Sequence, residues 1–326
     1  LAVVVAVLGF GVFPLLGDVG SVLDAARAVR PGWFVLGASL EVASIVAYAM
    51  FTRSLLPMPG RPPLHVLARI DLTTWGAGHV LPGGPAGTAA LRFRLLTARG
   101  VDRSGALMLA AVQGTGSAMV LHLILWVALL VAIPVYGGSW LYGLAAVVGL
   151  VATLGVLAGL LAALKGRERG LRILRWVAAQ VPALDADRVD RQMQALVRHL
   201  RRIGHDHRQL AVAASWAALN WLLDAAALWV FLLAFGHPVG VIGLLVAFGL
   251  ASVLAVLPIT PGGLGVVEGV LVPTLIAFGV PGAPALLAVL GWRVVNFWLP
   301  VPAAGLSYLS LRVRHAVPAT CSAPAG

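Results

Sequence analysis

The sequence predicts an all-α, polytopic helical membrane protein of about eight crossings, and three observations support this class. Apolar residues make up 60% of the 326 positions and charged residues only 11%, whereas about a quarter of the residues in a soluble domain are charged. The charges are clustered, which leaves several stretches of roughly 20 apolar residues, enough to cross a ~30 Å hydrocarbon layer. These stretches are continuous Leu, Val and Ala runs, whereas a transmembrane β-barrel has alternating strands of about ten residues.

The apolar runs place the crossings along the chain. The predicted crossings are 1–17, 33–52, 105–133, 140–163, 209–235, 240–257 and 283–310, with a short broken element at 258–279. That element contains three prolines, five glycines and Glu268, so it is either a short crossing or a re-entrant hairpin. Irregular backbone at membrane depth is tolerated only where it is buried in protein or lines a wet cavity. Both geometries therefore predict a site there.

Basic residues are concentrated in two connecting segments. Of the 23 Lys and Arg residues, 11 lie within 165–208 and seven within 53–103. The positive-inside rule places such segments in the cytoplasm, and with an even number of crossings both termini are expected there as well. The net charge of +11 is therefore expected to face lipid headgroups, and no nucleic-acid partner is expected.

The chain is predicted to form a single transmembrane domain over 1–326. Two halves, 1–163 and 209–326, would be joined by the basic cytoplasmic segment 164–208. Apolar residues recur at helical spacing within 186–203, which favours an amphipathic helix on the inner leaflet. A solvated helical hairpin is the alternative.

A short internal similarity supports two repeated halves. Leu81-Pro82-Gly83-Gly84 and Thr260-Pro261-Gly262-Gly263 share a Pro-Gly-Gly core. Each follows the second crossing of its half, so a repeat would be a parallel one, as in some transporters. In a chain with 38 glycines and 20 prolines, chance is the alternative.

Four polar residues lie near the middle of predicted crossings. They are Glu41, Asp224, Arg293 and Asn296. A charge at the bilayer centre costs at least about 2.5–3.5 kcal/mol, so these side chains should face a partner or a cavity. An ion pair such as Asp224–Arg293 is the structural interpretation. A polar pathway for a headgroup, an ion or a proton is the functional one.

A second candidate site follows the first Pro-Gly-Gly core. In a helix from about Thr88, the residues Arg92, Arg99 and Arg103 share one face. Gly83 and Gly84 would allow close backbone approach, and a helix start with arginines suits a phosphate. The alternative is an interfacial helix whose arginines anchor it to anionic lipid.

Several functions are not expected from this sequence. It contains no Walker loop, nucleophile elbow, HExxH motif or dinucleotide fingerprint. The histidines within 199–207 have no Cys neighbours and are typical of a solvated loop, so no metal site and no cofactor are expected. We therefore do not expect an enzyme.

The segment Pro258-Ile-Thr-Pro-Gly-Gly-Leu-Gly-Val-Val-Glu-Gly269 resembles the signature of the lysylphosphatidylglycerol synthase transmembrane-region family, also called the flippase-like domain family. Pro82-Gly-Gly-Pro-Ala-Gly87, with Arg92, Leu95 and Gly100, is similar to a second signature, although Gly78-His79 replaces an Asn-rich lead-in. The resemblance implies a bacterial inner-membrane protein that binds or moves lipids. It also implies a stand-alone member without the soluble aminoacyltransferase domain.

The resulting hypothesis is translocation of a lipid or lipid-linked headgroup. The expected partners are anionic membrane lipids, with a separate enzyme partner and a homo-oligomer left open. A gate would form from Pro261, Gly262, Gly263, Gly265 and Glu268. Secondary transport of a small solute, and an intramembrane transferase or membrane partner acting on a lipid carrier, are the alternatives.

Overall fold

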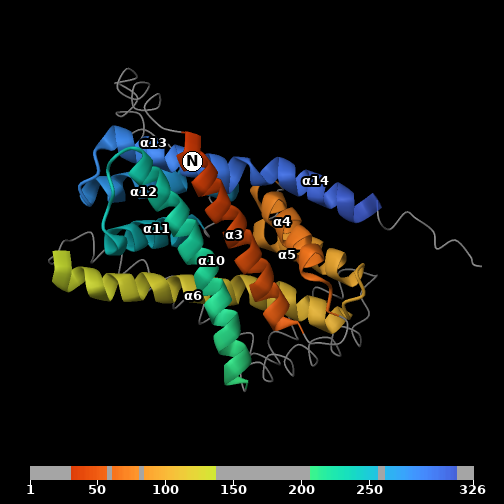
Figure 1. The fold of residues 1–326 in the computed structure, drawn as a ribbon. Helices are drawn as coiled ribbons and strands as arrows, with labels where there is room; N and C mark the ends of the chain where they lie inside the picture. The colour runs from red at the N-terminus through yellow and green to blue at the C-terminus, as the bar shows by residue number, and fades with distance from the viewer. Residues whose placement is uncertain (1–30, 57–60, 81–83, 137–205, 256–260, 314–326) are drawn as a thin grey trace, which may run out of the picture.

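The computed structural model describes residues 31–56, 61–80, 84–136, 206–255 and 261–313, and every element in these ranges is a helix (Figure 1). The elements are α3 (Pro31–Leu55), α4 (Leu64–Val80), α5 (Gly84–Thr97), α6 (Arg103–Tyr136), α10 (His207–Ala234), α11 (Val241–Ala255), the 3-10 turn η3 (Pro261–Gly263), α12 (Val266–Ala277), α13 (Gly282–Arg293), the π-helical turn η4 (Val294–Trp298) and α14 (Pro300–Val313). The predicted all-α class is confirmed. The predicted crossings 1–17 and 140–163 and the amphipathic segment 186–203 lie outside the described residues.

Within the described residues, four helical stretches are long and apolar enough to cross a membrane. They are Pro31–Leu55, Gly105–Ala132, His207–Ala234 and Gly282–Arg312. They coincide with the predicted crossings 33–52, 105–133, 209–235 and 283–310, which confirms a helical membrane protein. The total of eight crossings stays a prediction, because two of the predicted ones lie outside the described residues.

Two pairs of shorter helices pack against these long ones. The short helix α4 packs against α5, and α11 packs against α12. The 12 residues of α12 rise only about 18 Å at 1.5 Å per residue, less than the ~30 Å hydrocarbon layer. The predicted crossing 240–257 corresponds to α11, which is also short, and the broken element 258–279 contains η3 and α12. Sequence patterns did not predict α4.

Each short pair is connected through one of the Pro-Gly-Gly stretches. The second residue of the first Gly-Gly pair, Gly84, begins α5, and the second stretch forms η3 between α11 and α12. The turn η3 also contacts α4. The two stretches therefore have equivalent places, each before the second helix of a short pair, while the division into two repeated halves stays a prediction.

The long helices enclose an apolar core and present apolar side chains outward. Helix α10 packs along α3, and α14 packs along α4 (Figure 1). The ring of Phe231 on α10 is fully buried. It occupies the space left by two glycines, since a Cβ atom on Gly37 or Gly291 would lie 2.7 or 2.9 Å from it. Large exposed side chains such as Leu123, Leu130 and Leu306 suit a lipid environment.

Candidate functional site

A cluster of polar residues is buried among α3, α10, α12 and α13. It contains the four residues predicted from their positions in apolar segments, Glu41, Asp224, Arg293 and Asn296, together with Glu268 of the predicted gate. The structure brings all five together, although they come from distant parts of the chain. Burying so many polar groups is costly unless they bind one another, and the contacts below show how they do.

Glu268 and Arg293 form the central ion pair. Nε of Arg293 lies 2.6 Å from Oε1 of Glu268. The other carboxylate oxygen accepts a 2.7 Å hydrogen bond from the backbone N–H of Gly265 and so caps the first turn of α12. An acidic side chain is favourable there because it satisfies a free N–H group and faces the positive end of the helix dipole.

Asp224 has different partners from those expected of it. The structural interpretation of the sequence suggested an Asp224–Arg293 ion pair, but Arg293 pairs with Glu268. Oδ1 of Asp224 accepts hydrogen bonds from Nε1 of Trp292 at 2.8 Å and from Nδ2 of Asn296 at 3.0 Å. The same Nδ2 atom lies 3.4 Å from both carboxylate oxygens of Glu41. Two acidic side chains therefore share one amide.

Three residues at the junction of α13 and the π-helical turn η4 organise this cluster. Trp292 and Arg293 end α13, and Asn296 lies in η4. Trp292 and Asn296 contact Asp224, whereas Arg293 contacts Glu268. Single π-helical turns are rare and are frequently found at functional sites. No local sequence signal predicted this one.

The predicted gate is a tight glycine turn next to this cluster. Gly262, Gly263 and Gly265 have φ angles of 60°, 68° and 80°, a left-handed conformation that glycine adopts at little cost. A Cβ atom on Gly262 would collide with the ring of Phe297 and lie 3.1 Å from Cδ2 of His79. The carbonyl of Gly262 accepts a 3.3 Å hydrogen bond from Nη2 of Arg293. Pro261 begins the turn.

A second buried polar cluster contains the first predicted headgroup arginine. Nη1 of Arg92 lies 2.9 Å from Oδ1 of Asp71, and its Nη2 donates to Thr74 at 2.7 Å. Thr52 donates to the other oxygen of Asp71 at 2.7 Å, and Gln113 donates to Thr52. Arg92 is only 8% exposed. It thus forms a buried ion pair with an acidic residue that sequence patterns did not single out.

The three predicted headgroup arginines do not converge on one site in the structure. Arg92 points into the protein toward Asp71, and Arg99 donates a 2.7 Å hydrogen bond from Nη2 to the carbonyl of Leu311 on α14. Arg103 begins α6, after a turn that interrupts the helix expected to carry all three. Gly84 begins α5, and Gly83 lies outside the described residues.

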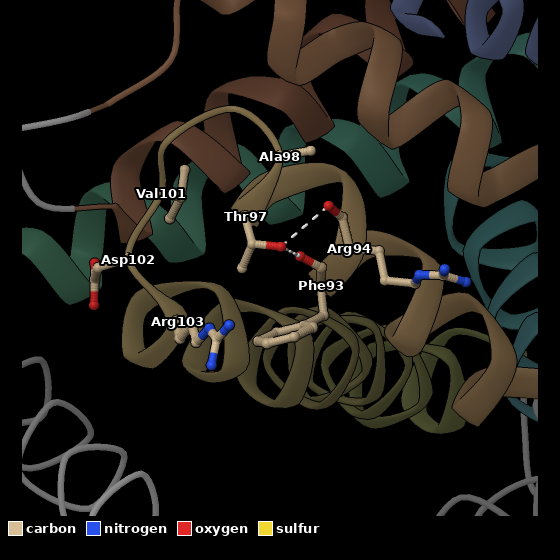
Figure 2. A pocket seen from close by; sticks show the side chains of 7 residues that line it. All are labelled: Phe93, Arg94, Thr97, Ala98, Val101, Asp102 and Arg103. Atoms are coloured by element: carbon tan, nitrogen blue, oxygen red, sulfur yellow. Dashed lines mark hydrogen bonds between the residues drawn. The ribbon is translucent and has the colours of Figure 1, made fainter. Parts of the chain in front are cut away.

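Arg103 instead lines an open pocket of about 730 Å³ where α5 ends and α6 begins (Figure 2). The lining residues are Phe93, Arg94, Thr97, Ala98, Val101, Asp102 and Arg103. Arg94 and Arg103 are exposed, and Figure 2 shows them on opposite sides of the Phe93 ring. Arg94 was not predicted, because it is offset from the face of Arg92 and Arg99 by two residues.

A chain of ring contacts joins the two buried clusters. The guanidinium of Arg92 lies 5.7 Å from the Tyr48 ring centroid, and the Tyr48 and Trp75 centroids are 6.3 Å apart. Nε1 of Trp75 donates to Nε2 of His79 at 3.1 Å. The ring of His79 stacks on Phe297 at 4.3 Å, and Arg293 lies 4.8 Å from the same Phe297 ring.

Known proteins resemble this chain at the level of sequence. Two UPF0104 membrane proteins of Methanothermobacter thermautotrophicus are 26% identical over 152 residues and 24% identical over 140 residues. These matches cover 44% and 41% of this chain and 45% and 41% of the relatives, so they span less than half the length of each relative. The family model of the lysylphosphatidylglycerol synthase TM region matches residues 1–304. With this match over most of its length, the chain belongs to the lysylphosphatidylglycerol synthase TM region family.

Proposed function

We propose that this protein translocates a lipid or a lipid-linked headgroup across the bacterial inner membrane. The observation that carries the proposal is the pocket between α5 and α6, which combines Arg94 and Arg103 with the apolar side chains of Phe93 and Val101. An anionic lipid has the matching chemistry, because its phosphate binds guanidinium groups and its glycerol and acyl carbons contact apolar surface.

The position of the pocket suits a headgroup. Arg103 immediately precedes the apolar stretch Gly105–Ala132, so the pocket lies at one end of a membrane-spanning helix. Phosphates of a bilayer lie at the ends of such helices, outside the hydrocarbon layer. In our proposal, the basic connections place this end at the cytoplasmic leaflet, with the chain termini on the same side.

The buried cluster around Arg293 would accommodate the headgroup during its passage. A polar headgroup that enters hydrocarbon loses its hydration, and polar side chains at that depth reduce the loss. Glu41 belongs to α3, which contacts both α10 and turn η4, and Asn296 of η4 binds Asp224 of α10. The glycine turn at Gly262 contacts the same cluster through Arg293, so its movement would open the cluster toward lipid while the acyl chains stay in the bilayer.

A reconstituted lipid-translocation assay tests this proposal. The purified full chain in liposomes would receive fluorescent phosphatidylglycerol or an aminoacylated analogue, and dithionite would report the leaflet exposed. We expect the double variant Arg94→Ala/Arg103→Ala to reduce the rate by at least about tenfold, since a hydrogen bond to a charged group contributes about 1.5–3 kcal/mol. Arg208→Ala is the matched control, because it removes an exposed arginine outside the pocket and should leave the rate unchanged.

The assay also separates the alternatives. A double variant that moves lipid at the wild-type rate would exclude the pocket as the headgroup site. Movement of neither lipid by the wild-type protein would contradict translocation of these lipids and would favour a small solute or an enzyme partner.

A further inference from the structure

The carboxyl groups of Glu41 and Asp224 meet in one buried site although they belong to different helices. Both interact with Nδ2 of Asn296, which is 3.0 Å from Asp224 and 3.4 Å from Glu41. The two carboxyl groups therefore lie next to each other at one amide nitrogen. Glu41 is 4% exposed and Asp224 is 5% exposed. Two carboxylates so close together in a poorly hydrated interior repel each other, and a proton bound to one of them would relieve this repulsion.

The charges that face this pair do not neutralise it. In the part of the chain that the structure describes, Arg293 of α13 is the cation beside this pair, but its Nε atom binds Glu268 of α12 and its Nη2 atom binds the carbonyl of Gly262. Trp292 and Asn296, the other contacts, are neutral. The ring of His79 on α4 contacts Phe297, and its Nε2 accepts a hydrogen bond from Trp75. Three carboxyl groups therefore share one guanidinium.

The hydrogen bonds indicate which carboxyl group holds the proton. Asp224 accepts two N–H donors at 2.8 and 3.0 Å, which stabilise its ionised form. Glu41 receives only the longer 3.4 Å contacts from the amide already bound to Asp224. Glu41 is thus the better proton carrier of the two, and a proton on it would have the adjacent carboxylate of Asp224 as its acceptor.

We propose that Glu41 and Asp224 form a proton-binding site, in which Glu41 carries the proton, and that release of this proton drives opening of the cluster. The coupling to lipid movement rests on the function proposed above, whereas the proton site does not. Release converts the Glu41 carboxylic acid to a carboxylate and transfers the proton to water. A second buried negative charge then has to be solvated, which favours a state with water or a cationic headgroup in the cluster.

The structure offers a direct route from this site to the glycine turn. Trp292, Arg293 and Asn296 are neighbours on α13 and η4, so a shift of the residues that bind Asp224 also moves Arg293. Arg293 in turn binds Gly262 and Glu268, one on each side of the turn's last glycine, Gly265. The proton on Glu41 would accordingly control the turn that we propose as the gate.

Infrared spectroscopy of the purified full chain in lipid nanodiscs tests the proton site. We expect the wild-type protein at neutral pH to show the carbonyl stretch of a buried, protonated carboxylic acid, slow to exchange in deuterated water. Glu41→Gln should lose this band while keeping the hydrogen-bonding shape of the side chain. Ser39→Ala, an exposed position on the same helix, should retain it. A wild-type spectrum without the band, or a band that persists in Glu41→Gln, would overturn the assignment.

Translocation in liposomes with an imposed pH gradient tests the coupling. We expect the wild-type rate to respond to the gradient and the rate of Glu41→Gln to be independent of it. A wild-type rate that ignores the gradient would overturn the coupling. If no lipid moves under any gradient, the proposed function fails, while the infrared result still decides whether the proton site exists.

Discussion

Nε of Arg293 lies 2.6 Å from Oε1 of Glu268, and this buried ion pair connects α13 to the glycine turn that precedes α12. Both partners also bind the turn itself, since Glu268 accepts from Gly265 and Arg293 donates to Gly262. The conformation of the turn therefore depends on two side chains that are 25 positions apart in the sequence.

Replacement of Glu268 should loosen this turn. Glu268→Gln keeps the shape of the side chain but removes the carboxylate that binds the buried guanidinium of Arg293 directly. Removing one partner of a buried pair costs about 3–5 kcal/mol, so we expect a clear fall in the thermal unfolding temperature, measured by tryptophan fluorescence in detergent. We also expect lipid movement to be lost.

The double variant Glu268→Gln/Arg293→Gln is the control for this interpretation. Because it removes both charges, it should be less destabilised than the sum of the two single variants. Strict additivity would show that the two residues act independently.

Replacement of Arg92 should lower the free energy of unfolding. In Arg92→Ala, the carboxylate of Asp71, which is 1% exposed, loses its cation, so we expect destabilisation of about 3–5 kcal/mol. The exposed Arg103→Ala should unfold close to the wild-type temperature. Equal unfolding temperatures for these two variants would contradict the buried Asp71–Arg92 pair. Asp71→Asn/Arg92→Gln should recover part of the loss, because it buries no unpaired charge.

Replacement of Gly262 by a residue with even the smallest side chain should destabilise the protein. In Gly262→Ala the left-handed backbone costs about 1–2 kcal/mol, and the added methyl group also displaces Phe297 or His79. Gly279→Ala is a matched control, because Gly279 has a φ of 89° but no atom within 4 Å of an added Cβ. Gly262→Ala should therefore lower the unfolding temperature more than Gly279→Ala does, and equal effects would show that the contact is unimportant.

The packing of α3 on α10 provides a further prediction. In Gly37→Ala the new methyl group would lie 2.7 Å from Cε2 of Phe231, and overpacking of this kind costs about 1–3 kcal/mol. Gly114→Ala, where nothing lies within 4 Å, should have little effect. Adding Phe231→Leu to Gly37→Ala should relieve the clash, so an unfolding temperature no higher than that of Gly37→Ala alone would contradict this packing.

The sequence by itself determined the class of protein and four of its long helices. Long apolar runs with few charges have a low free energy only where their backbone groups are paired internally in lipid. This condition acts locally, so the helices around 33–52, 105–133, 209–235 and 283–310 were predictable. It also made Glu41, Asp224, Arg293 and Asn296 conspicuous as polar residues in apolar surroundings, and the glycine turn was visible from its Pro-Gly-Gly core.

Only the tertiary structure decided which of these residues are partners. Arg293 binds Glu268 and not Asp224, and Arg92 binds Asp71, because helix rotation, the π-helical turn η4 and the packing of α4 determine which side chains face one another. These features depend on contacts between segments far apart in the chain, such as the pairing of α3 with α10. Helical periodicity assigns a residue to a face of its own helix, but the residue that meets it is decided by how the helices pack.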